Sequence, residues 1–456
     1  MPVTLPRDIT RRLERWRSGA RPKPLVLRGP RQVGKTTLVR AFGQRYDHFV
    51  ELNLERDQRG ISFAGMPPVR EWLLGLFLRE GLSPKPGASV LLFIDEIQQV
   101  PDAIQYLRYL YEDQEGVHVI AAGSLLEFAL GEVRSMPVGR VEFLSLYPLT
   151  FSEYLAWVGK SALAEALRSV PAASYAHPHL EAAFRDYALA GGMPEVVKGI
   201  RGGAAPAELR DVYASIWESY RVDLERHARS DHQRAVLQFL LGAAPHEHDR
   251  FAYARFGGSE YRSRDVKEAL ELLQLARVLR IVRPTSATRV PLVANTRARP
   301  RLQFLDTGLL NYATGLIGER VTLPELSIVY RGRLALHVVT QELIAAAESP
   351  DFEPFFWTRE SAQSNAEVDL LYRTGGRLLG LEVKSGPQGK LRSLHQYVER
   401  AGAQLGIRAL ENRASFQDAT TAGGYAYRLL NVPLYGVSEL AAYVRWAEGD
   451  RTNGSA

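Results

Sequence analysis

The stretch PLVLRGPRQVGKTTLVRAF, residues 24–42, decides the fold of the N-terminal part of the chain. It opens with a short apolar strand, and the residues after the glycine loop have the apolar spacing of a helix. Between strand and helix, Gly29, Gly34, Lys35 and Thr36 satisfy the pattern G-x-x-x-x-G-K-[ST]. In this pattern the backbone N–H groups of the loop and the positive end of the helix hold phosphate groups. The sequence therefore predicts a phosphate-binding loop (P-loop) rather than a simple glycine turn that caps a helix.

The loop also supplies two side chains for nucleotide chemistry. Lys35 is expected to reach the terminal phosphates, and the Thr36 hydroxyl to ligate magnesium. ATP and magnesium are therefore the predicted cofactors. The predicted nucleotide-binding residues are Gly29, Pro30, Arg31, Gln32, Val33, Gly34, Lys35, Thr36 and Thr37.

Two further apolar strands follow the loop. Residues 90–94 (VLLFI) run into Asp95 and Glu96, and residues 117–122 (VHVIAA) run into Gly123 and Ser124. Continuous apolar strands separated by helical stretches indicate a parallel sheet covered on both faces. The predicted fold class is α/β, beginning with a P-loop nucleotide-hydrolase domain.

The polar residues at these strand ends suit hydrolysis. Asp95 can hold the magnesium shell, while Glu96 can orient or deprotonate the attacking water. Ser124 can sense the terminal phosphate, although a serine at a strand end also forms turns. We expect Glu96 and Ser124 to be catalytic; ordinary polar strand ends are the alternative.

Composition limits the other possibilities. The 456 residues are 46% hydrophobic and 24% charged, with no cysteine, which excludes disulfides and thiolate zinc sites. There is neither an apolar run of about 18 residues nor a signal-peptide pattern, so we expect a cytoplasmic protein without a membrane partner.

The net charge of +6 suits a polyanionic partner. Arginine supplies most of the 57 basic residues, so lysine is scarce. Lys35 and Lys384 both lie in recognisable chemical motifs and are therefore candidates for functional residues.

Changes in pattern along the chain divide it into five segments. We expect a P-loop core at 1–150, a helical lid at 151–229 and a small helix-plus-wing module at 230–328. A third α/β unit follows at 329–447, with a disordered tail at 448–456.

Several motifs together resemble a known family, the predicted prokaryotic ATPases of the AAA superfamily that carry a C-terminal domain of unknown function. The resemblance covers nearly the whole chain and rests on GPRQVGKTTL, LLFIDEIQ, AAGSLLEF, GRVEFLSLYPLTFSEYL, GGMPEVV, FLDTGLL, EVDLL and LEVKSG, in that order. It implies an ATPase that assembles into rings or filaments, with a homo-hexamer as one option. It also implies an arginine finger that touches the neighbouring subunit's terminal phosphate, for which Arg140 is the first candidate and Arg134 the second. An ordinary surface arginine is the alternative for both.

The middle region resembles a winged helix. SEYRSRDVKEALELLQ, residues 259–274, would be the recognition helix, with Arg262, Arg264 and Lys267 placed for phosphates, and VLRIVRP would begin the wing. A surface helix packed by Leu270, Leu273 and Leu275 fits the same pattern, and winged helices also dock proteins.

The last third resembles the PD-(D/E)XK nuclease core, which includes Holliday-junction resolvases. Asp369 lies in EVDLL, while Glu382 and Lys384 alternate onto one face of the strand LEVK. Asp369 and Glu382 are the predicted metal ligands, and all three residues are predicted to be catalytic. Ordinary surface charges on amphipathic strands are the alternative.

One position departs from this nuclease pattern. The family usually has a glutamate one turn after the glycine that begins the preceding helix, but GRLALHVVTQEL has Leu336 there. Glu342, two turns further along, is a possible substitute, and an incomplete metal site is the other option.

The leading hypothesis is therefore an oligomeric Mg-ATP-dependent ATPase that binds and remodels double-stranded or branched DNA. Its nuclease-like domain would bind DNA rather than cut it. The alternative is a nucleotide-dependent switch or protein-remodelling scaffold whose C-terminal modules are docking surfaces.

Overall fold

The chain forms two compact units. One contains residues 1–147 together with Leu275–Arg277, and the other contains residues 148–274 and 278–456. The computed structural model describes residues 7–56, 62–113, 116–124, 126–128, 139–247, 249–317, 328–347, 349, 352–359, 366–386 and 391–449.

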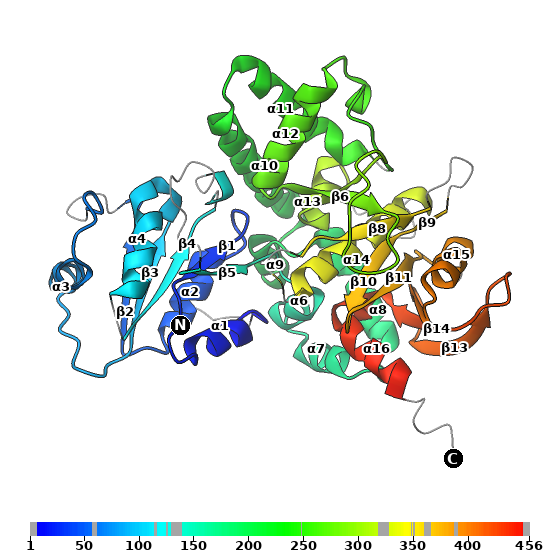
Figure 1. Cartoon of the computed structure of the whole chain (residues 1–456), viewed down its shortest axis with the longest axis horizontal. Helices are drawn as coiled ribbons and strands as arrows, with labels where there is room; N and C mark the ends of the chain where they lie inside the picture. The colour runs from blue at the N-terminus through cyan, green and yellow to red at the C-terminus, as the bar shows by residue number, and fades with distance from the viewer. Residues whose placement is uncertain are drawn as a thin grey trace. The chain divides into compact units, whose positions relative to one another are not determined.

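The first unit is built on a five-stranded parallel sheet in the order β2-β3-β4-β1-β5 (Figure 1). The strands are β1 (Leu25–Arg28), β2 (His48–Asn53), β3 (Val90–Asp95), β4 (Val117–Ala122) and β5 (Glu142–Ser145). The helices are α1 (Thr10–Arg17), α2 (Lys35–Gly43), α3 (Val69–Arg79) and α4 (Pro101–Glu112). This is the parallel sheet typical of a P-loop hydrolase domain, and it confirms the fold predicted for this part of the chain.

Both faces of this sheet are buried, which explains its uninterrupted apolar strands. Leu25 and Leu27 of β1 pack with residues of α1 and α2, whereas Val26 between them belongs to the cluster that includes α3 and α4. Phe93 and Ile94 of β3 divide between the same two clusters. Alternation along each strand therefore supplies two helix-covered cores from one apolar sequence.

The second unit begins with helices. They are α6 (Phe151–Trp157), α7 (Ser161–Arg168), α8 (His177–Ala190), α9 (Pro194–Arg201), α10 (Pro206–His227), α11 (Asp231–Ala243) and α12 (Ser263–Leu275). The last residue of α12, Leu275, is assigned to the first unit. Helix α6 starts at a capping box, in which Thr150 and Glu153 satisfy each other's backbone N–H groups. Residues 151–229 contain α6 to α10, as the expected helical segment requires, and the role of this segment as a lid stays a prediction.

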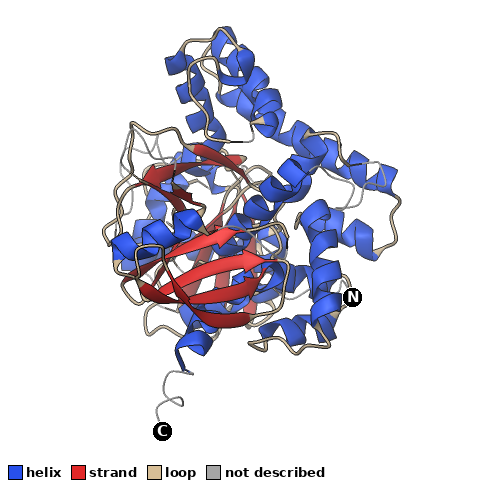
Figure 2. Cartoon of the chain, turned by 90° about the vertical axis from the view of Figure 1, so that its right-hand side faces the viewer, coloured by secondary structure: helices blue, strands red, loops and turns tan. Residues whose placement is uncertain are grey.

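Two sheets follow. The smaller has the order β7-β6-β8-β9, with β6 (Leu279–Thr285), β7 (Arg301–Phe304), β8 (Phe355–Thr358) and β9 (Glu367–Val368). The larger is mixed and has the order β10-β11-β12-β14-β13. Its strands are β10 (Leu370–Thr374), β11 (Arg377–Val383), β12 (Leu405–Leu410), β13 (Ser415–Thr420) and β14 (Ala426–Pro433). Figure 2 shows the strands of the chain in red, with helices around them.

Helices α13 (Thr307–Ala313), α14 (Ile328–Ala346), α15 (Arg392–Ala401) and α16 (Leu440–Gly449) complete this unit. Because β6 pairs with β8, one sheet contains strands from both sides of the boundary expected at 328/329. The tail predicted to be disordered from residue 448 starts too early, since Glu448 and Gly449 end α16; residues 450–456 lie outside the described part. Among the residues that the structure describes, no helix has the length and apolar character needed to cross a bilayer.

Candidate functional site

The loop between β1 and α2 has a backbone that its sequence makes possible. Gly29 has φ 154°, and a Cβ there would lie 2.4 Å from the carbonyl oxygen of Leu146. Gly34 has φ 90° and immediately precedes α2, so it makes the left-handed turn into the helix. The two glycines of the motif are therefore required by backbone geometry, and the first turn of α2 opens directly from the loop.

Lys35 lies inside this loop. Its Nζ donates hydrogen bonds to the carbonyl oxygens of Gly29 and Pro30, each over 2.8 Å. Burial lowers the pKa of Lys35 to about 8, and the nearby carboxylates of Glu96 and Asp95 oppose that shift. A buried ammonium that is held by backbone carbonyl oxygens is suited to a polyanionic ligand such as a triphosphate.

Thr36 and Asp95 come from separate motifs and meet at the carboxyl edge of the sheet. The Thr36 hydroxyl donates to Oδ2 of Asp95 over 2.8 Å. Asp95 is 3% exposed, and burial raises its pKa, with the hydrogen bond from Thr36 acting in the opposite direction. A hydroxyl and a carboxylate at this place fit the predicted magnesium ion, because both offer hard oxygen ligands.

Glu96 and Ser124 also lie together. Gln98 Nε2 donates to Oε2 of Glu96 over 2.5 Å, and the Ser124 hydroxyl donates to the same oxygen over 3.3 Å. Glu96 adopts a left-handed backbone with φ 52°, which is uncommon for a residue other than glycine and directs attention to a functional site. The predicted catalytic residues Glu96 and Ser124 are thus brought together, although their roles stay predictions.

One arginine of this unit was not expected from the sequence. Arg277 donates through Nε and Nη2 to Oε1 of Glu127, over 2.8 and 2.5 Å, and its side chain is only 15% exposed. Both residues act electrostatically on Lys35. The surrounding LLQLARVLR has no phosphate-binding pattern, so no local signal pointed to Arg277.

The two finger candidates have different outcomes. Arg140 lies two residues before β5, is 45% exposed and donates through Nε to Oε1 of Glu112 over 2.7 Å. It therefore forms a surface ion pair within its own chain, and its role toward a neighbouring subunit stays a prediction. Arg134 lies outside the described residues.

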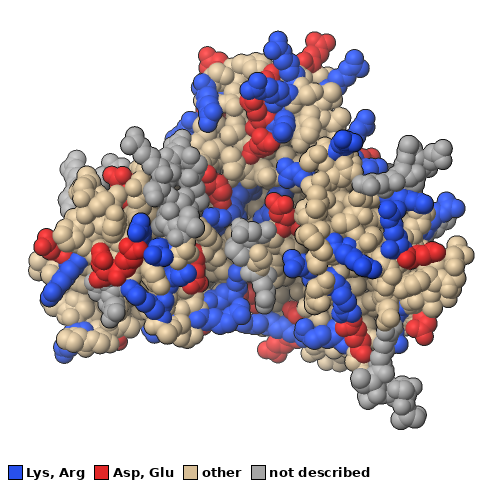
Figure 3. Space-filling model, in the orientation of Figure 1, with Lys and Arg blue, Asp and Glu red and all other residues tan. Residues whose placement is uncertain are grey.

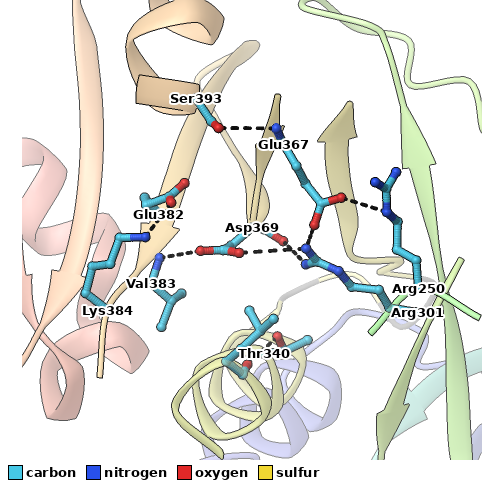
Figure 4. A network of polar contacts seen from close by, with 10 residues as sticks. Arg250, Arg301, Thr340, Glu367, Asp369, Glu382, Val383, Lys384 and Ser393 are labelled. Carbon is cyan, nitrogen blue, oxygen red and sulfur yellow. Dashed lines mark hydrogen bonds and ion pairs between the residues drawn. The ribbon is translucent and has the colours of Figure 1, made fainter. Parts of the chain in front are cut away.

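The nuclease-like residues of the second unit lie together (Figure 4). Lys384 Nζ donates to Oε1 of Glu382 over 2.6 Å, and Asp369 Oδ2 accepts the Val383 N–H over 2.8 Å. Burial and the neighbouring Asp369 raise the pKa of Glu382 to about 7, against the opposing effect of Lys384. Within the described part of the chain, no group of three or more histidine or acidic side chains is arranged to hold a metal ion.

Glu342 does not substitute for the missing helix glutamate, and that expectation is wrong. Its carboxylate accepts the Phe151 N–H over 3.1 and 3.2 Å, and its Oε1 lies 2.6 Å from the Tyr187 hydroxyl. These partners belong to the helical region rather than to β10 or β11. Glu342 is 1% exposed and serves to satisfy buried polar groups.

Three of the motifs that carry the family resemblance, PLTFSEYL, GGMP and FLDTGLL, lie close together near Glu342. Tyr187 Oη lies 2.8 Å from the carbonyl oxygen of Leu149, and the Leu149 N–H donates to Gly192 over 2.7 Å. Asp306 in turn accepts the Gly192 N–H over 2.6 Å. A Cβ at Gly192 would lie 2.1 Å from the Leu149 carbonyl oxygen. PLTFSEYL, GGMP and FLDTGLL therefore form one buried hydrogen-bonded centre, which explains these motifs structurally.

Helix α12 carries the basic residues expected to contact phosphates. Arg264 pairs with Glu268 over 2.8 Å, and Lys267 pairs with Glu271 over 3.9 Å. The three basic residues Arg262, Arg264 and Lys267 are exposed. Leu270 and Leu273 are buried as expected, whereas the packing role given to Leu275 is wrong, since it is 40% exposed.

The loop, the buried lysine and the acidic strand end define a P-loop nucleotide-hydrolase site, and sequence comparisons agree. Residues 21–155 match a family model described as an AAA domain. Residues 181–320 and 331–426 match two models described as domains of unknown function, DUF8612 and DUF4143. The chain therefore contains an AAA-type P-loop ATPase domain followed by regions that match two uncharacterised domains.

Relatives and solved structures are also similar to the chain. It is 28% identical over 391 residues to uncharacterized protein Rv2008c of Mycobacterium tuberculosis and to uncharacterized protein Mb2031c of Mycobacterium bovis. Each alignment covers 83% of this chain and 73% of the relative. The Walker-type ATPase PABY2304 of Pyrococcus abyssi is 16% identical with a TM-score of 0.43, covering 67% of this chain and 94% of that one.

Proposed function

We propose that the protein is a Mg-ATP-dependent, oligomeric AAA-type ATPase that binds and remodels double-stranded or branched DNA. The observation that carries the ATPase part is the contact of Thr36 with Asp95 beside the Glu96, Gln98 and Ser124 cluster, at the edge where the P-loop opens. In this arrangement Lys35 and the loop N–H groups bind the phosphates, while Glu96 orients the attacking water. Bound magnesium would neutralise charge on the phosphates.

The DNA part rests on the charge of the chain and on residues of α12 and of the larger sheet. The net charge is +6, and Figure 3 shows Lys and Arg side chains spread over the visible face, with acidic residues among them. The exposed Arg262, which directly precedes α12, and Lys267 of α12 are the residues that we assign to phosphate contacts. The mixed sheet with Asp369, Glu382 and Lys384 supports a nuclease-like module that binds rather than cuts.

DNA-stimulated ATP turnover tests this proposal. Linear, forked and four-way DNA should raise the turnover rate, and DNA affinity should fall steeply with salt. Arg262→Ala with Lys267→Ala should weaken DNA binding and reduce the salt slope by roughly 2, about one for each lost phosphate contact. Lys198→Ala with Arg201→Ala removes the same charge from α9 and should have little effect. An equal loss in both double variants would leave α12 without a specific role.

A second function has one observation in its favour. Because Arg264 and Lys267 pair with glutamates of the same helix, α12 presents a mixed surface that also suits protein docking. In that case a protein partner, and not DNA, would stimulate turnover.

DNA cleavage by the nuclease-like module is tested separately. The protein and its Asp369→Ala and Lys384→Ala variants are incubated with each DNA form in magnesium or manganese. Cleavage lost in both variants would contradict the binding role.

A further inference from the structure

The chain passes from the smaller to the larger sheet of the second unit at Asp369. This residue is a bend between β9, which pairs with β8, and β10, which pairs with β11. Glu367 precedes the bend, and Arg301 lies at the start of β7 in the smaller sheet. Figure 4 shows Arg301 directed from its strand toward both carboxylates.

Arg301 contacts both of these acidic residues. Its guanidinium forms an ion pair with Oε1 of Glu367 and lies 3.8 Å from Oδ1 of Asp369, while Nη1 is 3.4 Å from the Asp369 carbonyl oxygen. The guanidinium carbon also lies 4.5 Å from the ring centroid of Phe356. Only 17% of the Arg301 side chain is exposed. The guanidinium is therefore fixed by packing as well as by charge.

The other oxygens of the acidic cluster are largely engaged. Arg250 Nε lies 3.0 Å from Oε2 of Glu367, Asp369 Oδ2 accepts the Val383 N–H, and Glu382 Oε1 accepts from Lys384. Among these six carboxylate oxygens, Glu382 Oε2 is the buried one that has no hydrogen-bond partner. A divalent ion needs several free oxygen ligands, and this cluster does not offer them.

Helix α14 contributes no carboxylate to this cluster. In Figure 4, Thr340 of this helix lies below Asp369 and beside Arg301. Its hydroxyl donates to the carbonyl oxygen of Leu336, one turn earlier, over 2.7 Å. Leu336 has no polar group, and Glu342 is bound elsewhere.

Charge leads to the same conclusion. The six side chains of the cluster are three acidic residues, Glu367, Asp369 and Glu382, and three basic residues, Arg250, Arg301 and Lys384, so their formal charges balance. The exposed Asp249 also acts electrostatically on Arg301. Even with this fourth carboxylate, a divalent cation would leave an excess of positive charge among partly buried side chains, which is costly. The residues present therefore do not fit the metal ion that a PD-(D/E)XK site implies.

We propose that Arg301, which lies between Glu367 and Asp369, is an internal cation that takes the place of the divalent metal expected at Asp369 and keeps this site metal-free. The proposal does not depend on whether the protein binds DNA. A guanidinium cannot lower the pKa of a coordinated water as a metal does, so the site has no activated nucleophile for phosphodiester cleavage. Arg301 also joins β7 to the acidic bend between the two sheets.

Binding of Mn²⁺ alone, without nucleotide, tests the proposal in the full-length protein. Wild type and Asp369→Asn should bind the same amount of Mn²⁺, measured by electron paramagnetic resonance of free ion. Arg301→Leu should bind about one additional Mn²⁺ per chain, with affinity raised at least roughly tenfold, because two carboxylates lose their counter-ion. Adding Asp369→Asn to Arg301→Leu should abolish that gain.

Arg250→Leu is the matched control, since it removes an arginine from the same Glu367 but leaves Arg301 in place. It should gain no Mn²⁺. Two results would overturn the proposal: Mn²⁺ binding by wild type that Asp369→Asn removes, or a folded Arg301→Leu protein that gains none. If Arg301→Leu does not fold, Arg301→Gln repeats the test, and the comparison of wild type with Asp369→Asn decides without either variant.

Discussion

The hydroxyl of Thr36 donates a hydrogen bond to Oδ2 of Asp95 over 2.8 Å, joining the first turn of α2 to the end of β3. The two residues lie 59 positions apart in the sequence. In a parallel sheet the carboxyl ends of all strands lie at the same edge, so the loop after β1 and the acid that ends β3, two strands away, can share one ion. This contact is the physical basis of the ATPase assignment.

Lys35 and Glu96 should separate nucleotide binding from hydrolysis. Lys35→Ala should lose most ATP affinity, because it removes the buried cation of the loop. Glu96→Gln should keep ATP affinity but reduce turnover about 10²-fold or more, because the water loses its base. Binding of a fluorescent ATP analogue and release of phosphate measure the two effects.

Lys85→Ala serves as the control for this pair, because Lys85 is an exposed lysine of the same unit. Its ATP affinity and turnover should equal those of wild type. Normal turnover in Glu96→Gln would mean that another group activates the water, and the role given to Glu96 would be wrong.

Arg140 should act on a neighbouring subunit. Arg140→Ala should bind ATP normally but lose turnover, since a finger stabilises charge that develops in the transition state. Mixing inactive Arg140→Ala with inactive Lys35→Ala should restore part of the activity, because some interfaces then combine an intact loop with an intact finger. Phosphate release by the mixture, normalised to the fraction of mixed oligomer, is the measurement.

The control for Arg140 is Arg108→Ala. Arg108 pairs with the same Glu112, over 3.1 Å, and is similarly exposed. If loss of the Glu112 ion pair were the cause, both variants would lose turnover equally. A demonstrated mixed oligomer without recovery would count against a finger at position 140.

Glu342 should be important for stability and not for metal binding. Glu342→Ala leaves the Phe151 N–H without its buried acceptor and the Tyr187 hydroxyl with only the Leu149 carbonyl oxygen as acceptor, which should lower the free energy of unfolding by about 2 to 4 kcal/mol. Glu448→Gln, which removes an exposed pair with Arg377, should cost less than about 1 kcal/mol. Urea denaturation measures both changes, and equal small losses would contradict the buried role.

The parallel sheet and its site could be predicted because local signals carry them. The apolar strands ending at Asp95 and Ser124 and the glycine loop before Lys35 each have a recognisable pattern, and parallel topology brings their ends together. Leu336 was identified in the same way, as a departure from a local pattern.

The remaining parts of the site depend on contacts between distant segments. Arg301 reaches Glu367 and Asp369 from 66 and 68 positions away, and RPRLQF contains nothing that distinguishes this arginine from the others. Helical spacing did not show which side of α14 Glu342 occupies, because that depends on packing against α8. Counter-ions and helix rotation are set by tertiary structure, and no sequence motif encodes them.

Asp306 should make stability depend on pH. It is fully buried, and burial raises its pKa to about 6, although the Gly192 and Leu309 N–H groups stabilise the carboxylate. Because the pKa is higher in the folded state than in the unfolded state, the folded protein binds the proton more tightly between about pH 4 and 6. This group therefore contributes most to stability below about pH 4, and the contribution is lost as the pH rises through about 6.

Comparison with Asp306→Asn isolates this effect, because asparagine has nearly the same shape but does not titrate, and the other ionisable groups are common to both proteins. The free energy of unfolding of wild type minus that of the variant should rise by up to about 3 kcal/mol as the pH falls from 7 toward 4, since a shift of about two pKa units corresponds to that amount. Urea denaturation at several pH values measures the difference. A difference that is constant, or that shrinks on acidification, would mean that Asp306 is no more easily protonated in the folded protein than in the unfolded chain.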